Sequence, residues 1–140
     1  MKGAEPMKHG TAAPNCVLHI PHAARTIPSV LRDQFLVDDA TLKRELDRMT
    51  DSFTDLLFPD SPRIAMRVIA GVSRLVCDVE RLPDDADEPK VLRGMGALYE
   101  RGSDGTRLRT LTNGQRGDLL AAYYHPHHAA LTAAVDEVLT

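Results

Sequence analysis

Residues 18–28, LHIPHAARTIP, decide how this chain begins to fold. The apolar, β-branched run CVLHI (residues 16–20) lies between Pro14 and Pro21, which predicts a short buried strand followed by a turn. His22 follows this strand directly, and open α/β sheets bind ligands just beyond the carboxyl ends of their strands. The local residues leave two interpretations of His22 open: a metal ligand, or a hydrogen-bonded turn histidine.

Helical patterns follow this turn. Pro28 suits the first turn of a short helix over residues 29–36, and a longer apolar stripe predicts a second helix over residues 38–58. The last helix is expected over residues 112–139, where a possible capping box opens it. Pro126 should kink this helix, because a proline within a helix removes one backbone hydrogen bond and clashes with the preceding turn.

Strand patterns occupy the middle of the chain. Two runs rich in Val and Ile, residues 63–71 and 73–80, are too short for independent helices and are predicted to be strands. The acidic stretch over residues 81–96 is long for a connection and is a candidate functional loop. Residues 97–111 carry an Asp-Gly turn between two strand-like runs, which indicates a hairpin. Together these elements predict an α/β fold with a mixed sheet flanked by helices.

The composition is that of one globular domain. The 140 residues are 43% hydrophobic and 26% charged, with a net charge of -3, so nothing favours nucleic acid or an anionic membrane as partner. No stretch approaches the roughly 18 apolar residues of a membrane span. Cys16 and Cys77 lie in apolar runs without CxxC spacing and are expected to be reduced core residues of a cytoplasmic protein. We expect a flexible segment over residues 1–13 and a single domain over residues 14–140.

Three aspartates recur at helical spacing in the predicted second helix. Asp47, Asp51 and Asp55 are separated by four residues each, so they would stack on one helical face. Like charges that close repel unless a positive group lies among them. The pattern therefore indicates either a solvated acidic face or a site for a cation or an arginine.

Two arginines flank the run LVCDVE, residues 75–80, within the predicted strand. Arg74 lies near its start and Arg81 follows its end, and Asp78 is a charge that an interior strand seldom tolerates without a partner. A guanidinium can hold a carboxylate through two parallel hydrogen bonds, so either arginine could anchor an acidic substrate. A structural ion pair with Asp78 or Glu80 is an equal alternative.

The stretch YYHPHH, residues 123–128, concentrates three histidines and two tyrosines around Pro126. Adjacent histidines on a helix point in different directions, and only Tyr124 with His128 has the i, i+4 spacing of helical metal ligands. One histidine is therefore expected to face inward and the others to face solvent.

Five motifs, taken in order, resemble the N-formylglutamate amidohydrolase family. They are IPHAARTIP, TDSFTDLLF, SRLVCDVERLPDD, GMGALY and YYHPHHAAL. The resemblance in order and spacing extends from about residue 15 to residue 137. The resemblance implies a fold similar to that of zinc carboxypeptidases and aspartoacylase. It also implies metal-assisted hydrolysis, with zinc as cofactor, of the amide of an N-formyl or N-acyl acidic amino acid.

The resemblance assigns roles to individual residues. It implies that His22 is the first metal ligand and Asp51 the second, that Arg81 binds a substrate carboxylate, and that Arg74 supports it. No catalytic residue is assigned. The residues expected in supporting roles are Asp55, Asp78 and His128.

Two departures from the family pattern affect these expectations. Glu80 stands where many members have asparagine, which puts a negative charge beside the carboxylate clamp and argues against glutamate as the substrate. Members also continue after the last helix into an Asp-x-His-Ser motif whose histidine is the third metal ligand, whereas this sequence ends at Thr140. A catalytic zinc generally needs three protein ligands, so we expect a fold that is incomplete at its C-terminus.

Three functional hypotheses follow. The chain could be the N-terminal portion of an amidohydrolase, or a non-catalytic remnant or module that binds an acidic small molecule through Arg81. In the third, a histidine from HPHH (residues 125–128) of a second copy completes the site. An exposed sheet edge would favour self-association, so a homodimer is also expected.

Overall fold

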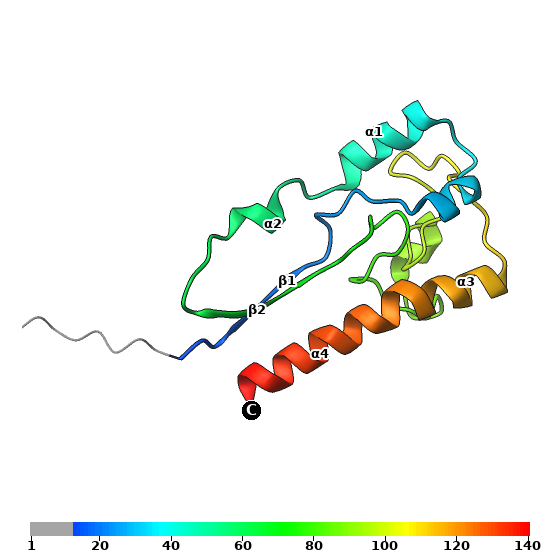
Figure 1. Cartoon of the computed structure of the whole chain (residues 1–140). Coiled ribbons are helices and arrows are strands. Elements are labelled where there is room, and N and C mark those ends of the chain that lie inside the picture. Colours follow the sequence, from blue (N-terminus) through cyan, green and yellow to red (C-terminus); the bar gives the residue numbers. More distant parts are fainter. Residues whose placement is uncertain (1–12) are drawn as a thin grey trace, which may run out of the picture.

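The computed structural model describes residues 13–140 (Figure 1). The expected flexible segment, residues 1–13, lies outside the described residues except for Ala13. The elements, in chain order, are β1 (Cys16–Ile20), the 3-10 helix η1 (Ser29–Gln34), α1 (Asp39–Met49), α2 (Thr54–Leu57), β2 (Ile64–Ile69), the 3-10 helix η2 (Pro89–Arg93), α3 (Asn113–Leu119), the π-helical segment η3 (Leu120–Tyr124) and α4 (His125–Leu139).

The sheet in the described part of the chain has two strands. β1 pairs with β2 in parallel, and α4 packs against both strands (Figure 1). The α/β class is confirmed, but the predicted mixed sheet is wrong for these residues. The predicted hairpin over residues 97–111 is present only in reduced form, as an Asp-Gly turn closed by one isolated antiparallel bridge between Arg101 and Arg107.

Residues 73–80 form buried turns, so the predicted strand is wrong. The backbone N–H groups of Val76 and Cys77 donate to the carbonyl oxygen of Ser73, and these turn hydrogen bonds replace a strand ladder. Leu75, Val76 and Cys77 are fully buried. Burial on every side explains the apolar run, and an apolar run of this length does not by itself identify a strand.

The predicted helix over residues 38–58 is broken in two. α1 ends at Met49, and Phe53, with a φ of 67°, opens the short helix α2 in the left-handed conformation. Between them the backbone N–H of Asp51 donates to the carbonyl oxygen of His22 at 2.9 Å. This long-range bond takes Asp51 out of the helix, so the three aspartates do not share one helical face.

The last helix begins as predicted, and its capping box is present. A π-helical segment, η3, precedes Pro126 and leads directly into α4, and the kink expected at Pro126 stays a prediction. Pro126 lies in the first turn of α4, where a missing N–H is tolerated. None of the helices in the described residues is long and apolar enough to cross a membrane.

The core packs around a buried arginine. Arg109 is fully buried; its Nε donates to the carbonyl oxygen of Tyr99 at 2.7 Å and its Nη2 to that of Val76 at 2.8 Å. Its guanidinium also lies over the Phe35 ring, 5.0 Å from the centroid. These contacts join the turn at residues 73–80, which carries the candidate site, to the segment that contains Tyr99.

The two cysteines have different environments. Cys77 is buried in the core, as predicted, and burial raises the pKa of its thiol to about 12. Cys16 is exposed at the start of β1, so the prediction of a core residue there is wrong. The alternation of a strand places successive side chains on opposite faces, and the first residue of a short strand need not be covered at all.

Candidate metal and carboxylate site

The structure places His22 in the turn directly after β1, where its side chain is only 4% exposed. Its Nε2 lies 2.8 Å from Asp78 Oδ1, and its Nδ1 lies 3.4 Å from Asp51 Oδ2. One ring nitrogen is therefore held by a buried carboxylate, while the other faces a second, exposed carboxylate.

Asp78 is the centre of this network. It is fully buried and accepts hydrogen bonds from Arg74 Nε (3.1 Å) and Nη2 (2.8 Å), from the Tyr99 hydroxyl (2.9 Å) and from the backbone N–H of Glu80 (3.0 Å), besides that from His22. Burial by itself would raise the pKa of Asp78. The hydrogen bond from His22 and the charge of Arg74 outweigh it and hold that pKa well below its usual range, so Asp78 is ionised.

Tyr99 is a site residue to which the sequence assigned no role. Burial, together with the negative charge of Asp78, raises the pKa of Tyr99 to about 12. Its hydroxyl therefore stays protonated and donates to Asp78 at neutral pH. Tyr99 is the last residue of the motif GMGALY, and this motif was the sequence signal that could have identified it as a site residue.

The two arginines have different partners. Arg74 donates two hydrogen bonds to Asp78; burial alone would lower the pKa of Arg74, but the Asp78 charge raises it. The structural ion pair expected as one alternative for Arg74 is therefore present, and its supporting role in substrate binding stays a prediction. Arg81 lies 3.8 Å from Asp78, measured from Nε to Oδ2, which is too long for a hydrogen bond. Its buried Nε has no hydrogen-bond partner within the described residues, and its side chain is 25% exposed.

Glu80 also reaches this site. Its side chain is 50% exposed, and its Oε2 lies 3.7 Å from His22 Nδ1. The carboxylates of Asp51 and Glu80 thus both approach the nitrogen that Asp78 leaves free.

Two side chains near Pro126 contact the backbone carbonyl oxygens of residues just after Asp78. His128 Nε2 lies 2.8 Å from the carbonyl oxygen of Val79, and the Tyr124 hydroxyl donates to the carbonyl oxygen of Arg81 at 2.8 Å. These contacts are compatible with the expected supporting role of His128. His127 is also partly buried and makes an Nε2–Nε2 contact of 2.9 Å with His19 on β1.

Asp55 lies apart from this network. It is exposed on α2 and, together with Arg25, Thr50 and Phe53, lines an open cleft of about 480 Å³. Asp47, on α1, forms ion pairs with Arg25 and Lys43, so an arginine lies beside this aspartate, as one of the two alternatives expected.

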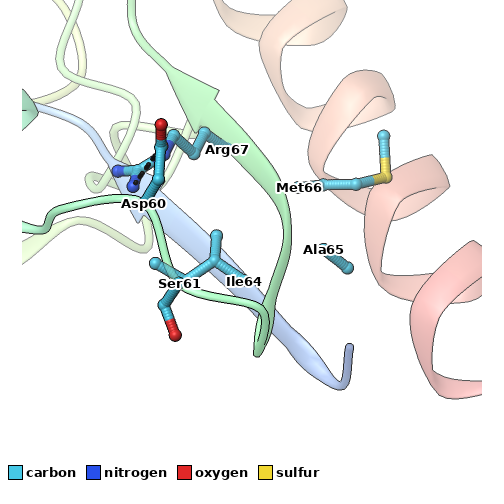
Figure 2. Close-up of a pocket in the computed structure, with 6 residues that line it drawn as sticks. All are labelled: Asp60, Ser61, Ile64, Ala65, Met66 and Arg67. Atoms are coloured by element: carbon cyan, nitrogen blue, oxygen red, sulfur yellow. Dashed lines mark ion pairs between the residues drawn. The ribbon is translucent and has the colours of Figure 1, made fainter. Parts of the chain in front are cut away.

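A separate hollow surrounds the start of β2 (Figure 2). It is lined by Asp60, Ser61, Ile64, Ala65, Met66 and Arg67. Asp60 and Arg67 form an ion pair of 3.5 Å within it, whereas Met66 points toward α4. It contains no residue of the Asp78 network and is not part of the candidate site.

The donor atoms around His22 suit zinc in type. Two ligands on a tetrahedral zinc lie about 3.3 Å apart, close to the 3.4 Å between His22 Nδ1 and Asp51 Oδ2. A metal-binding histidine commonly donates its other N–H to a carboxylate, as His22 does to Asp78. Within residues 13–140, however, no group of three or more His, Cys, Asp or Glu side chains is arranged to hold a metal ion. These residues thus offer two ligands, one fewer than a catalytic zinc generally uses.

Comparison with known proteins agrees with the motifs. The family model for N-formylglutamate amidohydrolase matches residues 15–140. The fold is similar to the crystal structure of N-formylglutamate amidohydrolase from Ralstonia eutropha JMP134, with a TM-score of 0.75 and 24% sequence identity. The match covers 90% of this chain and 49% of that one, so this chain spans about half of that protein's length. A search of the curated proteins found no match.

Proposed function

This chain belongs to the N-formylglutamate amidohydrolase family, and we propose that it contributes to metal-dependent hydrolysis of the amide of an N-formyl or N-acyl amino acid. The observation that carries the proposal is the position of His22. One ring nitrogen is held by the buried carboxylate of Asp78, and the other faces Asp51. This is the arrangement of a metal-binding histidine with its outer carboxylate.

In this proposal His22 and Asp51 hold a divalent cation, zinc. When bound, the cation supplies Lewis-acid chemistry: it polarises the acyl carbonyl and makes a water molecule a better nucleophile. Asp78 accepts a hydrogen bond from the N–H group at His22 Nε2, which leaves the lone pair on Nδ1 available as a ligand. Arg74 and Tyr99 keep Asp78 ionised and in position.

Arg81 binds the substrate carboxylate in this proposal. Two observations on Arg81 support this role. Its Nε is buried without a hydrogen-bond partner among the described residues, and its side chain is partly open to solvent. Leaving a buried donor unpaired costs about 1–3 kcal/mol, and a bound carboxylate would remove that cost through charge-assisted hydrogen bonds. The resemblance to the family gives the expectation of an acidic amino acid on this side of the amide.

A second candidate is a binding module that holds a carboxylate ligand without hydrolysing it. It is favoured by the count of two metal-binding side chains around His22, because catalytic zinc sites generally have three protein ligands and one open position. Under this alternative Arg81 still binds the ligand carboxylate, but the ligand is not hydrolysed.

One set of measurements separates the two. The full chain is incubated with Zn²⁺ and tested for release of formate or acetate from N-formyl and N-acetyl amino acids, and ligand binding is measured by calorimetry. We expect His22→Ala to abolish hydrolysis while ligand binding persists. Arg81→Ala should weaken binding by roughly tenfold or more, and Arg93→Ala, at an exposed arginine on η2, is the matched control.

The outcomes are distinct. Binding without turnover in the presence of Zn²⁺ supports the binding module and contradicts hydrolysis by this chain. If Arg81→Ala and Arg93→Ala bind the ligand equally well, Arg81 is not the carboxylate anchor in either function.

A further inference from the structure

The two arginines of the candidate site differ in how far they are engaged: Arg74 is hydrogen-bonded to Asp78, whereas Arg81 approaches Asp78 only at 3.8 Å. A ligand with two carboxylates is best held by two cationic side chains. The cationic side chains beside Asp78 are those of Arg74 and Arg81. Arg74 is already engaged by Asp78 through its Nε and Nη2 atoms. Of these two arginines, Arg81 is the one with a buried donor that has no hydrogen-bond partner among the described residues.

Other arginines of the described residues have partners elsewhere. Arg25 forms an ion pair with Asp47 at 2.5 Å, and Arg116 pairs with Asp85. Arg109 is fully buried and is bonded to backbone carbonyl oxygens of the core. None of these three offers a second anchor for an anionic ligand at His22.

Glu80 adds a negative charge where a second anchor would be needed. Its backbone N–H donates to Asp78 Oδ1 at 3.0 Å, which fixes the turn, and its Oε2 lies 3.7 Å from His22 Nδ1. The Asp51 carboxylate lies 3.4 Å from the same nitrogen. A second ligand carboxylate in this space would meet two like charges, and such repulsion is appreciable at short range even near a protein surface.

The formal charges of the site lead to the same conclusion. Asp51, Asp78 and Glu80 are negative, and Arg74 and Arg81 are positive, so the set carries one net negative charge. A divalent cation at His22 would change this to one net positive charge, which a single carboxylate neutralises.

We propose that this site selects N-acyl amino acids with one carboxylate and an uncharged or cationic side chain, and that Glu80 is the residue that disfavours a second carboxylate. The inference rests on the proposed function, since it names the substrate class of the same site. It departs from the acidic amino acid expected from the resemblance to the family, because an acidic amino acid carries a second carboxylate.

Two ligands of nearly the same shape test it. N-formyl-L-glutamine and N-formyl-L-glutamate differ by one charge at the end of the side chain. Their dissociation constants are measured by calorimetry on the full 140-residue chain, with and without Zn²⁺. We expect the glutamine derivative to bind at least about fivefold more tightly at low salt, and this preference should shrink as added salt screens the charges.

Two isosteric variants show whether Glu80 is responsible. Glu80→Gln should reduce the preference to near unity or reverse it, mainly by tightening binding of the glutamate derivative. Glu137→Gln, at an exposed position on α4, makes the same change in net charge away from the site and should leave the preference unchanged. Circular dichroism and thermal unfolding establish that both variants are folded.

Three results would overturn the inference. These are equal or tighter binding of the glutamate derivative by the unmodified chain, an unchanged preference in Glu80→Gln, and no binding of either ligand. Hydrolysis is recorded on the same samples. If neither ligand is hydrolysed but the preference for the glutamine derivative is intact, the proposed hydrolysis is contradicted and the charge selection is supported. If the glutamate derivative is hydrolysed faster, hydrolysis is supported and the charge selection is contradicted.

Discussion

His22 Nε2 lies 2.8 Å from Asp78 Oδ1, and this buried hydrogen bond joins two residues that are 56 positions apart in the chain. It ties the end of β1 to the turn at residues 73–80. Because Asp78 is ionised, the histidine is the donor, and its other nitrogen is left facing Asp51 and Glu80.

Asp78→Asn should destabilise the fold by about 3 kcal/mol, because it leaves the charge of Arg74 largely buried without a counter-charge. The Arg74 side chain is only 14% exposed. Urea unfolding followed by circular dichroism measures the change. Asp136→Asn, at an exposed position on α4, should shift stability by no more than about 0.5 kcal/mol; equal effects of the two variants would argue against a structural role for the Arg74–Asp78 pair.

His22→Ala should remove most of the Zn²⁺ affinity, because it deletes the nitrogen ligand of the proposed site. Asp51→Asn should also weaken it, and Asp78→Asn should weaken it by roughly 10- to 100-fold through the lost outer contact. Competition with a chromophoric chelator gives the constants. His125→Ala, at an exposed histidine, is the control. If His22→Ala and His125→Ala retain the same affinity, any bound zinc lies elsewhere.

Arg109→Met should cost about 3 kcal/mol of unfolding free energy, since it leaves the carbonyl oxygens of Val76 and Tyr99 without their buried donors. Methionine keeps much of the side-chain length, so the missing hydrogen bonds dominate. Chemical denaturation measures the loss. Arg107→Met, at an exposed position nearby, should be close to neutral, and a near-neutral Arg109→Met would show that the guanidinium is dispensable.

The contact between His19 and His127 should make the fold less stable in mild acid. Burial, with smaller effects of His19 and His128, lowers the pKa of His127 from 6.5 to about 4. Between these values the unfolded chain binds more protons than the folded one, so stability is complete above about pH 6.5 and falls as the pH drops toward 4. Allowing for solvent screening, we expect a loss of about 1 kcal/mol between pH 7 and pH 5.

Urea midpoints at several pH values measure this slope, and His127→Gln should flatten it. The pKa of His19 is also lowered, mainly by burial, although Glu80 opposes this shift, so His19 contributes with the same sign. Asp78 titrates well below this range and does not interfere. A slope that His127→Gln leaves unchanged would assign the acid sensitivity to other groups.

Several features were predictable because they depend on neighbours in sequence. The strand over residues 16–20, the short helix after Pro28 and the capping box of the last helix are all present. The ordered motifs identified the family, which the match over residues 15–140 confirms. The zinc carboxypeptidase-like fold and the single domain over residues 14–140 stay predictions.

The errors occurred where distant contacts override local patterns. The run at residues 73–80 has the composition of a strand, but Arg109 and the core hold it as turns. The helical stripe over residues 38–58 is interrupted because the backbone of Asp51 bonds to that of His22. Neither contact can be inferred from periodicity, since each joins residues well separated in the chain.

The sequence by itself determined that a histidine follows a short strand and that carboxylates and arginines occur in the motifs of one family. The tertiary structure alone decided how these charges are paired. Asp78 lies within hydrogen-bond distance of both His22 and Arg74, whereas Arg81 lies 3.8 Å away and keeps a free donor. Hydrogen bonds act over about 3 Å, so which of two equally suitable arginines is engaged depends on the packed positions of their atoms rather than on residue type.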